Sequence, residues 1–176
     1  MNTEHESPLA SLEPGSVVLY EHPSGERVVE SLPRDAFDNL LVLTTRGDLA
    51  RLERTVTSHG GTPGRVGVVP ITGATVDYTG PLWITKQVAP SDLTGISIRF
   101  SEAFRHVEPG AGWVVVDNLG VLAMYVEEER LYRLVDSIAS AVRKRDARCV
   151  LATTTGVLGE RSLARLRDTA DEKITR

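Results

Sequence analysis

Five short runs of β-forming residues alternate with segments of helical periodicity, and this alternation limits the fold of the chain more than any other feature. The runs are residues 16–20, 39–45, 65–69, 113–117 and 148–153. The second run is apolar at consecutive positions, as is typical of a strand that is covered on both faces. Strands that alternate with helices predict a parallel sheet between helices, so we expect an α/β fold.

The segments between the runs carry the apolar stripe of amphipathic helices. The clearest helix is predicted for residues 127–145, where one face holds Leu131, Leu134, Val135, Ile138 and Val142. Its acidic start and basic end suit the helix dipole, and the basic end is interpreted as a solvated cap. Shorter helices are predicted for 47–59, for 92–106 with Asp92 as the N-cap, and for 160–167, followed by a terminal strand at 173–175.

Length and composition predict one soluble globular domain. The chain has 176 residues, of which 41% are hydrophobic and 25% charged, and this is enough to bury a core. Residues 1–11 are expected to form a disordered N-terminal segment, and residues 12–176 the folded domain. No apolar run approaches the roughly 18 residues of a membrane span, and Cys149 is the sole cysteine. We therefore expect a cytoplasmic protein.

Charge and histidine spacing argue against two classes of partner. The net charge of -4 gives no indication of a broad nucleic-acid surface. The four histidines are scattered without metal-ligand spacing, and with a single cysteine no zinc or other metal site is expected.

The run 113–117 ends abruptly on a carboxylate, Asp117. In open α/β sheets the ligand crevice lies at the carboxyl ends of the strands, so Asp117 could be a ligand to magnesium-bound water. Acids also sit at strand ends as turn-forming residues, with no ligand. The sequence leaves both interpretations open.

The segment after the first run, residues 21–28 (EHPSGERV), occupies the place of a phosphate-binding loop. Its backbone amides could meet an anion, and Arg27 could replace the usual lysine electrostatically. The candidate nucleotide-binding residues are Ser24, Gly25, Glu26, Arg27 and Asp117. Carboxylates in the same loop would repel phosphate, and only one glycine allows close backbone approach. The pattern favours a structural turn over tight nucleotide binding.

Together these segments resemble the RecA superfamily, and within it the KaiC/GvpD-like archaeal branch. The resemblance covers residues 12–176 and rests on 12–19 (LEPGSVVL), 92–98 (DLTGISI), 113–119 (WVVVDNL), 150–154 (VLATT) and 169–174 (TADEKI). The 17 arginines against three lysines resemble a haloarchaeal subgroup. The resemblance implies a RecA-like three-layer sandwich with a mainly parallel central sheet. It also implies that strand 149–153 lies between strands 16–20 and 113–117, and that the Asp117–Asn118 peptide bond is cis.

The chain departs from the family pattern at the groups that act on ATP. The Lys-Thr pair of the phosphate loop is absent from 21–28, and residues 44–47 (TTRG) replace the two catalytic glutamates that follow the second strand. These losses remove most of the charge preorganisation that hydrolysis needs. We therefore expect no catalytic residue and no resident cofactor. The expected function is a regulatory or protein-interaction module; the alternatives are a switch that binds ATP and magnesium weakly, and a DNA-associated recombinase paralogue.

The irregular segment 70–90 carries more apolar area than a free loop usually exposes. Its apolar residues are Ile71, Val76, Tyr78, Leu82, Trp83 and Ile84. Such a segment either folds back on the sheet or forms a partner or self-association site, and we favour the second, with Trp83 as the interaction candidate. The expected partner is an unidentified protein or a second copy of the chain, rather than nucleic acid or a membrane.

Overall fold

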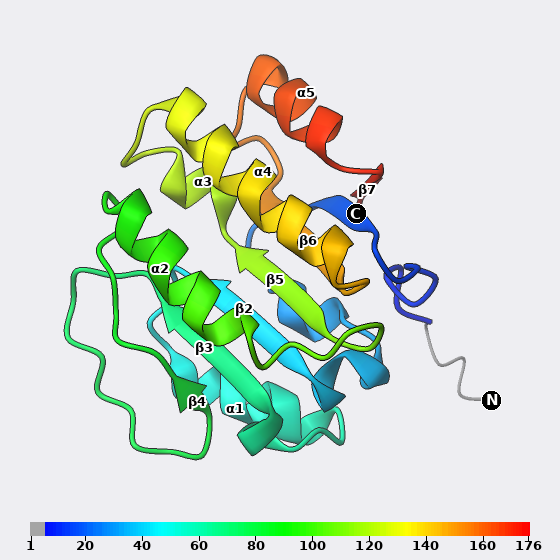
Figure 1. Ribbon diagram of the computed structural model, residues 1–176, viewed down its shortest axis with the longest axis vertical. Helices are drawn as coiled ribbons and strands as arrows, with labels where there is room; N and C mark the ends of the chain where they lie inside the picture. Colours follow the sequence, from blue (N-terminus) through cyan, green and yellow to red (C-terminus); the bar gives the residue numbers. More distant parts are fainter. Residues whose placement is uncertain (1–5) are drawn as a thin grey trace.

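All seven strands of the central sheet run parallel, in the order β4-β3-β2-β5-β6-β1-β7 (Figure 1). The structure is a computed structural model that describes residues 6–176. The strands are β1 (Val17–His22), β2 (Leu40–Thr44), β3 (Val66–Pro70), β4 (Trp83–Ile84), β5 (Trp113–Asp117), β6 (Arg148–Thr154) and β7 (Glu172–Thr175). The strand predicted at 148–153 lies between those predicted at 16–20 and 113–117, which confirms the expected strand order.

Helices cover both faces of the sheet, so the expected three-layer α/β fold is confirmed (Figure 1). One layer holds α2 (Leu93–Phe104), α3 (Leu119–Leu122), α4 (Glu128–Lys144) and α5 (Glu160–Thr169). The other holds α1 (Leu49–Ser58) with the 3-10 helices η1 (Val28–Ser31) and η2 (Arg34–Asp38); a third, η3 (Pro63–Arg65), precedes β3. No helix in the described part of the chain is long and apolar enough to cross a membrane.

Strand β5 shows why its sequence is apolar at every position. Val114 and Val116 pack into the core beneath α2 and α4, whereas Trp113 and Val115 pack into the core beneath α1. All five residues of the strand are therefore buried. A strand covered on both faces has no solvated side on which a polar residue could alternate.

The first strand extends further than predicted. It continues past residue 20, because Glu21 and His22 pair in register with Thr153 and Thr154 of β6. The beginning of the supposed phosphate loop is therefore part of the sheet. The predicted N-cap of α2 is present, since the Asp92 carboxylate accepts a hydrogen bond from the Gly95 amide at 2.8 Å.

The N-terminal segment differs from the expectation of disorder up to residue 11. Residues 1–5 lie outside the described part of the chain, so disorder of these five residues stays a prediction. Leu9 is fully buried in the core beneath α1, and the Ser7 hydroxyl donates a hydrogen bond to the Ser31 carbonyl oxygen. The packed domain therefore begins before residue 12.

The basic end of α4 is not the solvated cap that its composition suggested. Arg143 Nη2 donates to the Thr169 carbonyl oxygen at 2.6 Å, and Arg145 donates to the Phe104 carbonyl oxygen. Arg148, which follows on β6, donates through Nε to the Leu12 carbonyl oxygen at 2.6 Å. These guanidinium groups donate hydrogen bonds to backbone carbonyl oxygens at helix ends and in loops, which would otherwise lack partners.

Most of segment 70–90 folds back on the sheet. Ile71 and Leu82 are buried, and Val76, Tyr78 and Ile84 pack partly buried against the core beneath α1. Trp83 is the member of the six that stays open, with 42% of its surface exposed. The structure thus narrows the apolar surface predicted for this segment to one side chain.

The burial of Leu9 predicts that the N-terminal segment contributes to stability. Leu9→Ala should lower the free energy of unfolding by about 2–4 kcal/mol, because it leaves a cavity in a closed core. Glu13→Ala, at an exposed position four residues further along the chain, serves as the control. Denaturant unfolding measures both, and equal stability of the two variants would contradict the packing of Leu9.

Candidate functional site

Four neighbouring strands end at the same edge of the sheet. They end at Thr44 on β2, Asp117 on β5, Thr154 on β6 and His22 on β1. Asp117 lies in register with Thr44 on one side and with Ala152 of β6 on the other. The carboxyl edge of a parallel sheet is where α/β proteins place their ligands, so Asp117 stands at the middle of the candidate site.

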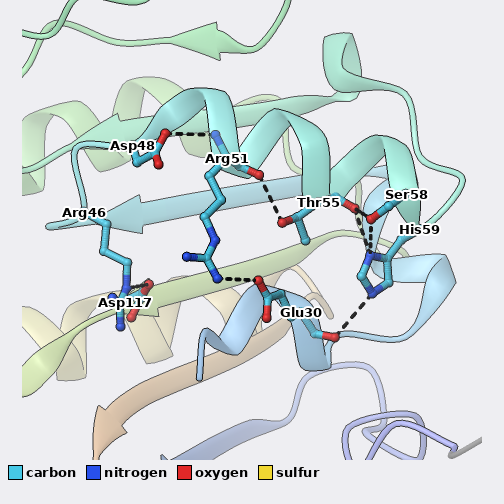
Figure 2. A network of polar contacts seen from close by, with 8 residues as sticks. All are labelled: Glu30, Arg46, Asp48, Arg51, Thr55, Ser58, His59 and Asp117. Carbon is cyan, nitrogen blue, oxygen red and sulfur yellow. Dashed lines mark hydrogen bonds and ion pairs between the residues drawn. The ribbon is translucent and has the colours of Figure 1, made fainter. Parts of the chain in front are cut away.

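Asp117 forms an ion pair with Arg46, which lies in the loop between β2 and α1 (Figure 2). Arg46 Nε lies 3.1 Å from Asp117 Oδ2, and 3% of the Asp117 side chain is exposed, against 33% for Arg46. Two hydrogen bonds fix the start of the loop that carries Arg46. The Thr45 amide donates to the Asp117 carbonyl oxygen, and the Arg46 amide donates to Thr44 Oγ1. A carboxylate this deeply buried is costly without a counter-charge, and Arg46 supplies it.

The residue after Asp117 links β5 to β6. The Asp117–Asn118 peptide bond is cis, as expected from the resemblance. Asn118 Nδ2 donates to Thr154 Oγ1 at 2.9 Å, and Asn118 Oδ1 accepts from the Gly120 amide at 2.9 Å. Asp117 Oδ1 is buried and has no hydrogen-bond partner among the described residues. One carboxylate oxygen therefore remains available beside the one that Arg46 holds.

Two further arginines approach Asp117 from other elements. Arg27, in the loop after β1, and Arg51, on α1, line a cavity together with Arg46 and Asp117. The cavity has a volume of about 20 Å³, which is enough for roughly one water molecule. Three arginines thus line this cavity together with the buried Asp117 and the exposed Asp48.

The three arginines differ in their partners. Arg51 Nη2 lies 3.1 Å from Glu30 Oε1 (Figure 2). Arg27 makes no ion pair or side-chain hydrogen bond within residues 6–176. Burial, followed by repulsion from Arg51 and Arg46, lowers the pKa of the Arg27 guanidinium, although it stays charged. Arg27 is therefore a cation held beside other cations; the carboxylates of Asp48 and Asp117 offset part of this lowering of its pKa, but neither forms an ion pair with it.

The carboxylates of the predicted phosphate loop are held by the last strand. Lys173 Nζ lies 3.0 Å from Glu21 Oε1, and 7% of the Glu21 side chain is exposed. Arg176 Nε lies 3.5 Å from Glu26 Oε2, and the Arg176 amide donates to the Glu21 carbonyl oxygen at 2.9 Å. Strand β7 and Arg176 directly after it therefore fix this loop in place.

The five predicted nucleotide-binding residues do not form one cluster. Arg27 and Asp117 line the same cavity, but Glu26 pairs with Arg176 instead. Ser24 and Gly25 lie exposed in the turn, where Gly25 has a φ of +89° that favours glycine, and they do not line the cavity.

Sequence reasoning missed the cations that neutralise the strand-end acids. Arg46 was considered only as part of a segment that lacks glutamates, and Lys173 only as part of a terminal strand. No local signal pointed to Arg46, because only the pairing of β2 with β5 places it beside Asp117. Trp83, the predicted interaction residue, is the first residue of β4. It pairs with Gly67, near the start of β3.

Residues 15–175 match the model of a family of unknown function, DUF7504, and the chain belongs to this family. No curated protein matches the chain.

Two solved structures are similar in fold. The KaiC-like protein PH0186 of the hyperthermophilic archaeon Pyrococcus horikoshii OT3 aligns over 98% of this chain and 77% of its own, with a TM-score of 0.66 and 14% identity. The uncharacterized protein PH0321 of Pyrococcus horikoshii, in complex with an unknown peptide, aligns over 96% and 80%, with a TM-score of 0.61 and 14% identity. At this identity the similarity shows a shared KaiC-like fold.

The ion pair at the centre of the site predicts strong energetic coupling. A double-mutant cycle with Arg46→Ala and Asp117→Ala should give a coupling free energy of at least about 1 kcal/mol, because the carboxylate is desolvated. The exposed pair Arg34–Asp38 is the control and should couple more weakly. Unfolding in denaturant measures both cycles; equal coupling in the two pairs would contradict the importance of burial.

Proposed function

We propose that this KaiC-like domain does not hydrolyse ATP and acts as a regulatory or protein-interaction module. The Arg46–Asp117 ion pair carries the proposal. It places a fixed cation on the carboxylate that, by the family resemblance, would face magnesium. Asp117 then stabilises the fold at the sheet edge instead of positioning a metal ion.

The residues around Asp117 do not fit a magnesium ion with a bound nucleotide. Magnesium takes oxygen ligands in octahedral geometry, but Asp117 Oδ2 already pairs with Arg46 Nε at 3.1 Å, which leaves Oδ1 as the one free oxygen of this carboxylate. Arg27, which makes no ion pair among the described residues, lines the same cavity and adds positive charge that repels a dication. Within residues 6–176 no group of three His, Cys, Asp or Glu side chains is placed to hold a metal ion.

The loop after β2 offers no free carboxylate to activate water. Residues 44–47 read Thr-Thr-Arg-Gly, and the next acid, Asp48, is used as the N-cap of α1. Its Oδ1 accepts a hydrogen bond from the Arg51 amide at 3.0 Å (Figure 2). Hydrolysis needs a positioned base or water-orienting group in addition to the phosphate clamp, and this loop supplies an arginine there instead.

An interaction role has support from the fold comparison and from one exposed side chain. The similar PH0321 structure contains a bound peptide, so a protein of this fold associates with a peptide. On this chain the exposed aromatic side chain of Trp83 is the candidate contact. Exposed tryptophans are frequent among the residues that dominate protein–protein binding energy.

A second candidate function, weak anion binding as a switch, is favoured by one observation. Arg27 lacks an acidic partner among the described residues and stands beside Arg46 and Arg51. A phosphate group at the mouth of this cavity would relieve the repulsion among the three guanidinium groups. This binding would need no magnesium and no hydrolysis.

The absence of hydrolysis predicts an enzymatic result. Purified protein with magnesium and ATP should release no more phosphate than a heat-inactivated sample, because neither the phosphate-loop lysine nor a catalytic glutamate is present. Turnover that disappears in Asp117→Ala would contradict the proposal. Turnover that Asp117→Ala leaves unchanged would come from a contaminating ATPase, and the purified protein would then be measured again.

The second candidate predicts a phosphate effect that depends on Arg27. Inorganic phosphate, without magnesium, should raise the unfolding free energy by about 1.4 kcal/mol at about ten times its Kd, relative to chloride of equal ionic strength. Arg27→Gln should lose this gain, whereas Arg161→Gln, an exposed arginine of α5, should keep it. The same phosphate gain in all three proteins would exclude a site at Arg27.

A further inference from the structure

A pocket with a volume of about 440 Å³ lies near the starts of β2 and β3, far along these strands from Asp117. Leu40 and Val66, the first residues of the two strands, form part of its wall. Trp83 on β4 and His106, just after α2, form another part. The volume is in the range of pockets that hold small ligands or single large side chains.

The aromatic wall of the pocket is fixed by its neighbours. The rings of Trp83 and His106 meet edge to face, with centroids 5.0 Å apart. The indole lies against Gly67, where an added Cβ would come within 3.0 Å of Trp83 Cε3. Asn39 fixes the loop beside His106, since its Nδ2 donates to the His106 carbonyl oxygen and its Oδ1 accepts from the Glu108 amide. Trp83 therefore presents a ring that His106 and Gly67 support, with 42% of its surface still open.

The charged residues of the pocket favour a cation. Asp38 and Glu108 contribute two carboxylates, against one guanidinium from Arg65. Glu108 makes no ion pair among the described residues, and Asp38 pairs only with the exposed Arg34. An ion pair exposed to this degree is weak and exchanges readily.

The contact made by Trp113, the other tryptophan of the chain, indicates which group packs on an indole face in this protein. Arg148 lies over the ring of Trp113, with its Cζ 5.6 Å from the ring centroid. Arg145 and Arg165 lie in the same way over Phe104 and Tyr132, at 4.3 Å and 5.2 Å. Within residues 6–176 no cation lies over Trp83.

We propose that this pocket binds an arginine side chain of a protein partner. A planar guanidinium stacks on the open indole face while its N–H groups reach the carboxylates of Asp38 and Glu108. The inference rests on the proposed interaction function and names the chemistry of its contact. A purely apolar occupant would leave the two carboxylates desolvated, and an acidic one would meet their repulsion.

The test is an NMR titration of the two tryptophan side chains. The chain has two tryptophans, so its ¹⁵N spectrum contains two indole N–H signals, and the one missing in Trp83→Phe belongs to Trp83. The probes are N-acetyl-arginine amide, the isosteric but neutral N-acetyl-citrulline amide, and N-acetyl-glutamate amide, at constant ionic strength. The arginine probe should shift the Trp83 signal saturably and leave the Trp113 signal in place. Citrulline and glutamate should bind at least about five-fold more weakly, because they lack the charge that the carboxylates attract.

A matched pair of variants tests the carboxylate. Glu108→Gln should weaken the arginine probe about three-fold, as loss of a partly exposed ion pair does, whereas Glu172→Gln on the distant β7 should not. The proposal is overturned if no probe gives a saturable shift, if citrulline or glutamate matches arginine, or if Glu108→Gln has no effect. If the Trp83 signal shifts with protein concentration in the absence of any probe, the pocket binds a second copy of the chain. The proposal of a separate protein partner is then overturned.

These outcomes are distinct from those that decide the proposed function. ATP turnover dependent on Asp117 would contradict the loss of hydrolysis without changing the Trp83 signal. A titration without a saturable shift would overturn the arginine contact and would not bear on the Arg46–Asp117 ion pair.

Discussion

The burial of a carboxylate at the centre of a doubly covered parallel sheet is the constraint on which the site depends. Strand β5 is buried along its whole length, so Asp117 at its end is buried as well. A charge in that position requires a nearby counter-charge, and the loop after β2 provides one because Thr44 lies in register with Asp117. The same architecture that makes the core therefore brings Arg46 to the acid.

Strand β1 meets the same requirement in the same way. Glu21 ends up almost fully buried at the sheet edge, and Lys173 from the adjacent strand β7 neutralises it. Both acids at this edge thus receive a counter-charge from a side chain of the chain itself, although Asp117 Oδ1 has no hydrogen-bond partner among the described residues. Under the proposed function, these internal cations take the place of the charges that a ligand would bring. The carboxyl edge of the sheet then contributes to stability, and the partner binds at the Trp83 pocket.

Features with local signals could be predicted from the sequence. The limits of β5 and the N-cap Asp92 followed from an apolar run and from a short-range capping pattern. Arg46 could not be paired with Asp117 in this way, because 71 positions separate them and only the sheet brings them together. Leu9 was missed because a single apolar residue has no periodicity, and segment 70–90 because its apolar residues follow neither a helix nor a strand period.

The most direct test of the central claim is the response of the unaltered protein to magnesium alone. Thermal unfolding should show no stabilisation beyond that of sodium chloride at equal ionic strength, since Arg46 already neutralises Asp117 through Oδ2 and the remaining Oδ1 is a single ligand. Arg46→Glu serves as the positive control, because two carboxylates beside each other should gain magnesium-dependent stability. Magnesium-dependent stabilisation of the unaltered protein that disappears in Asp117→Asn would show that the ion displaces Arg46, and would contradict the account.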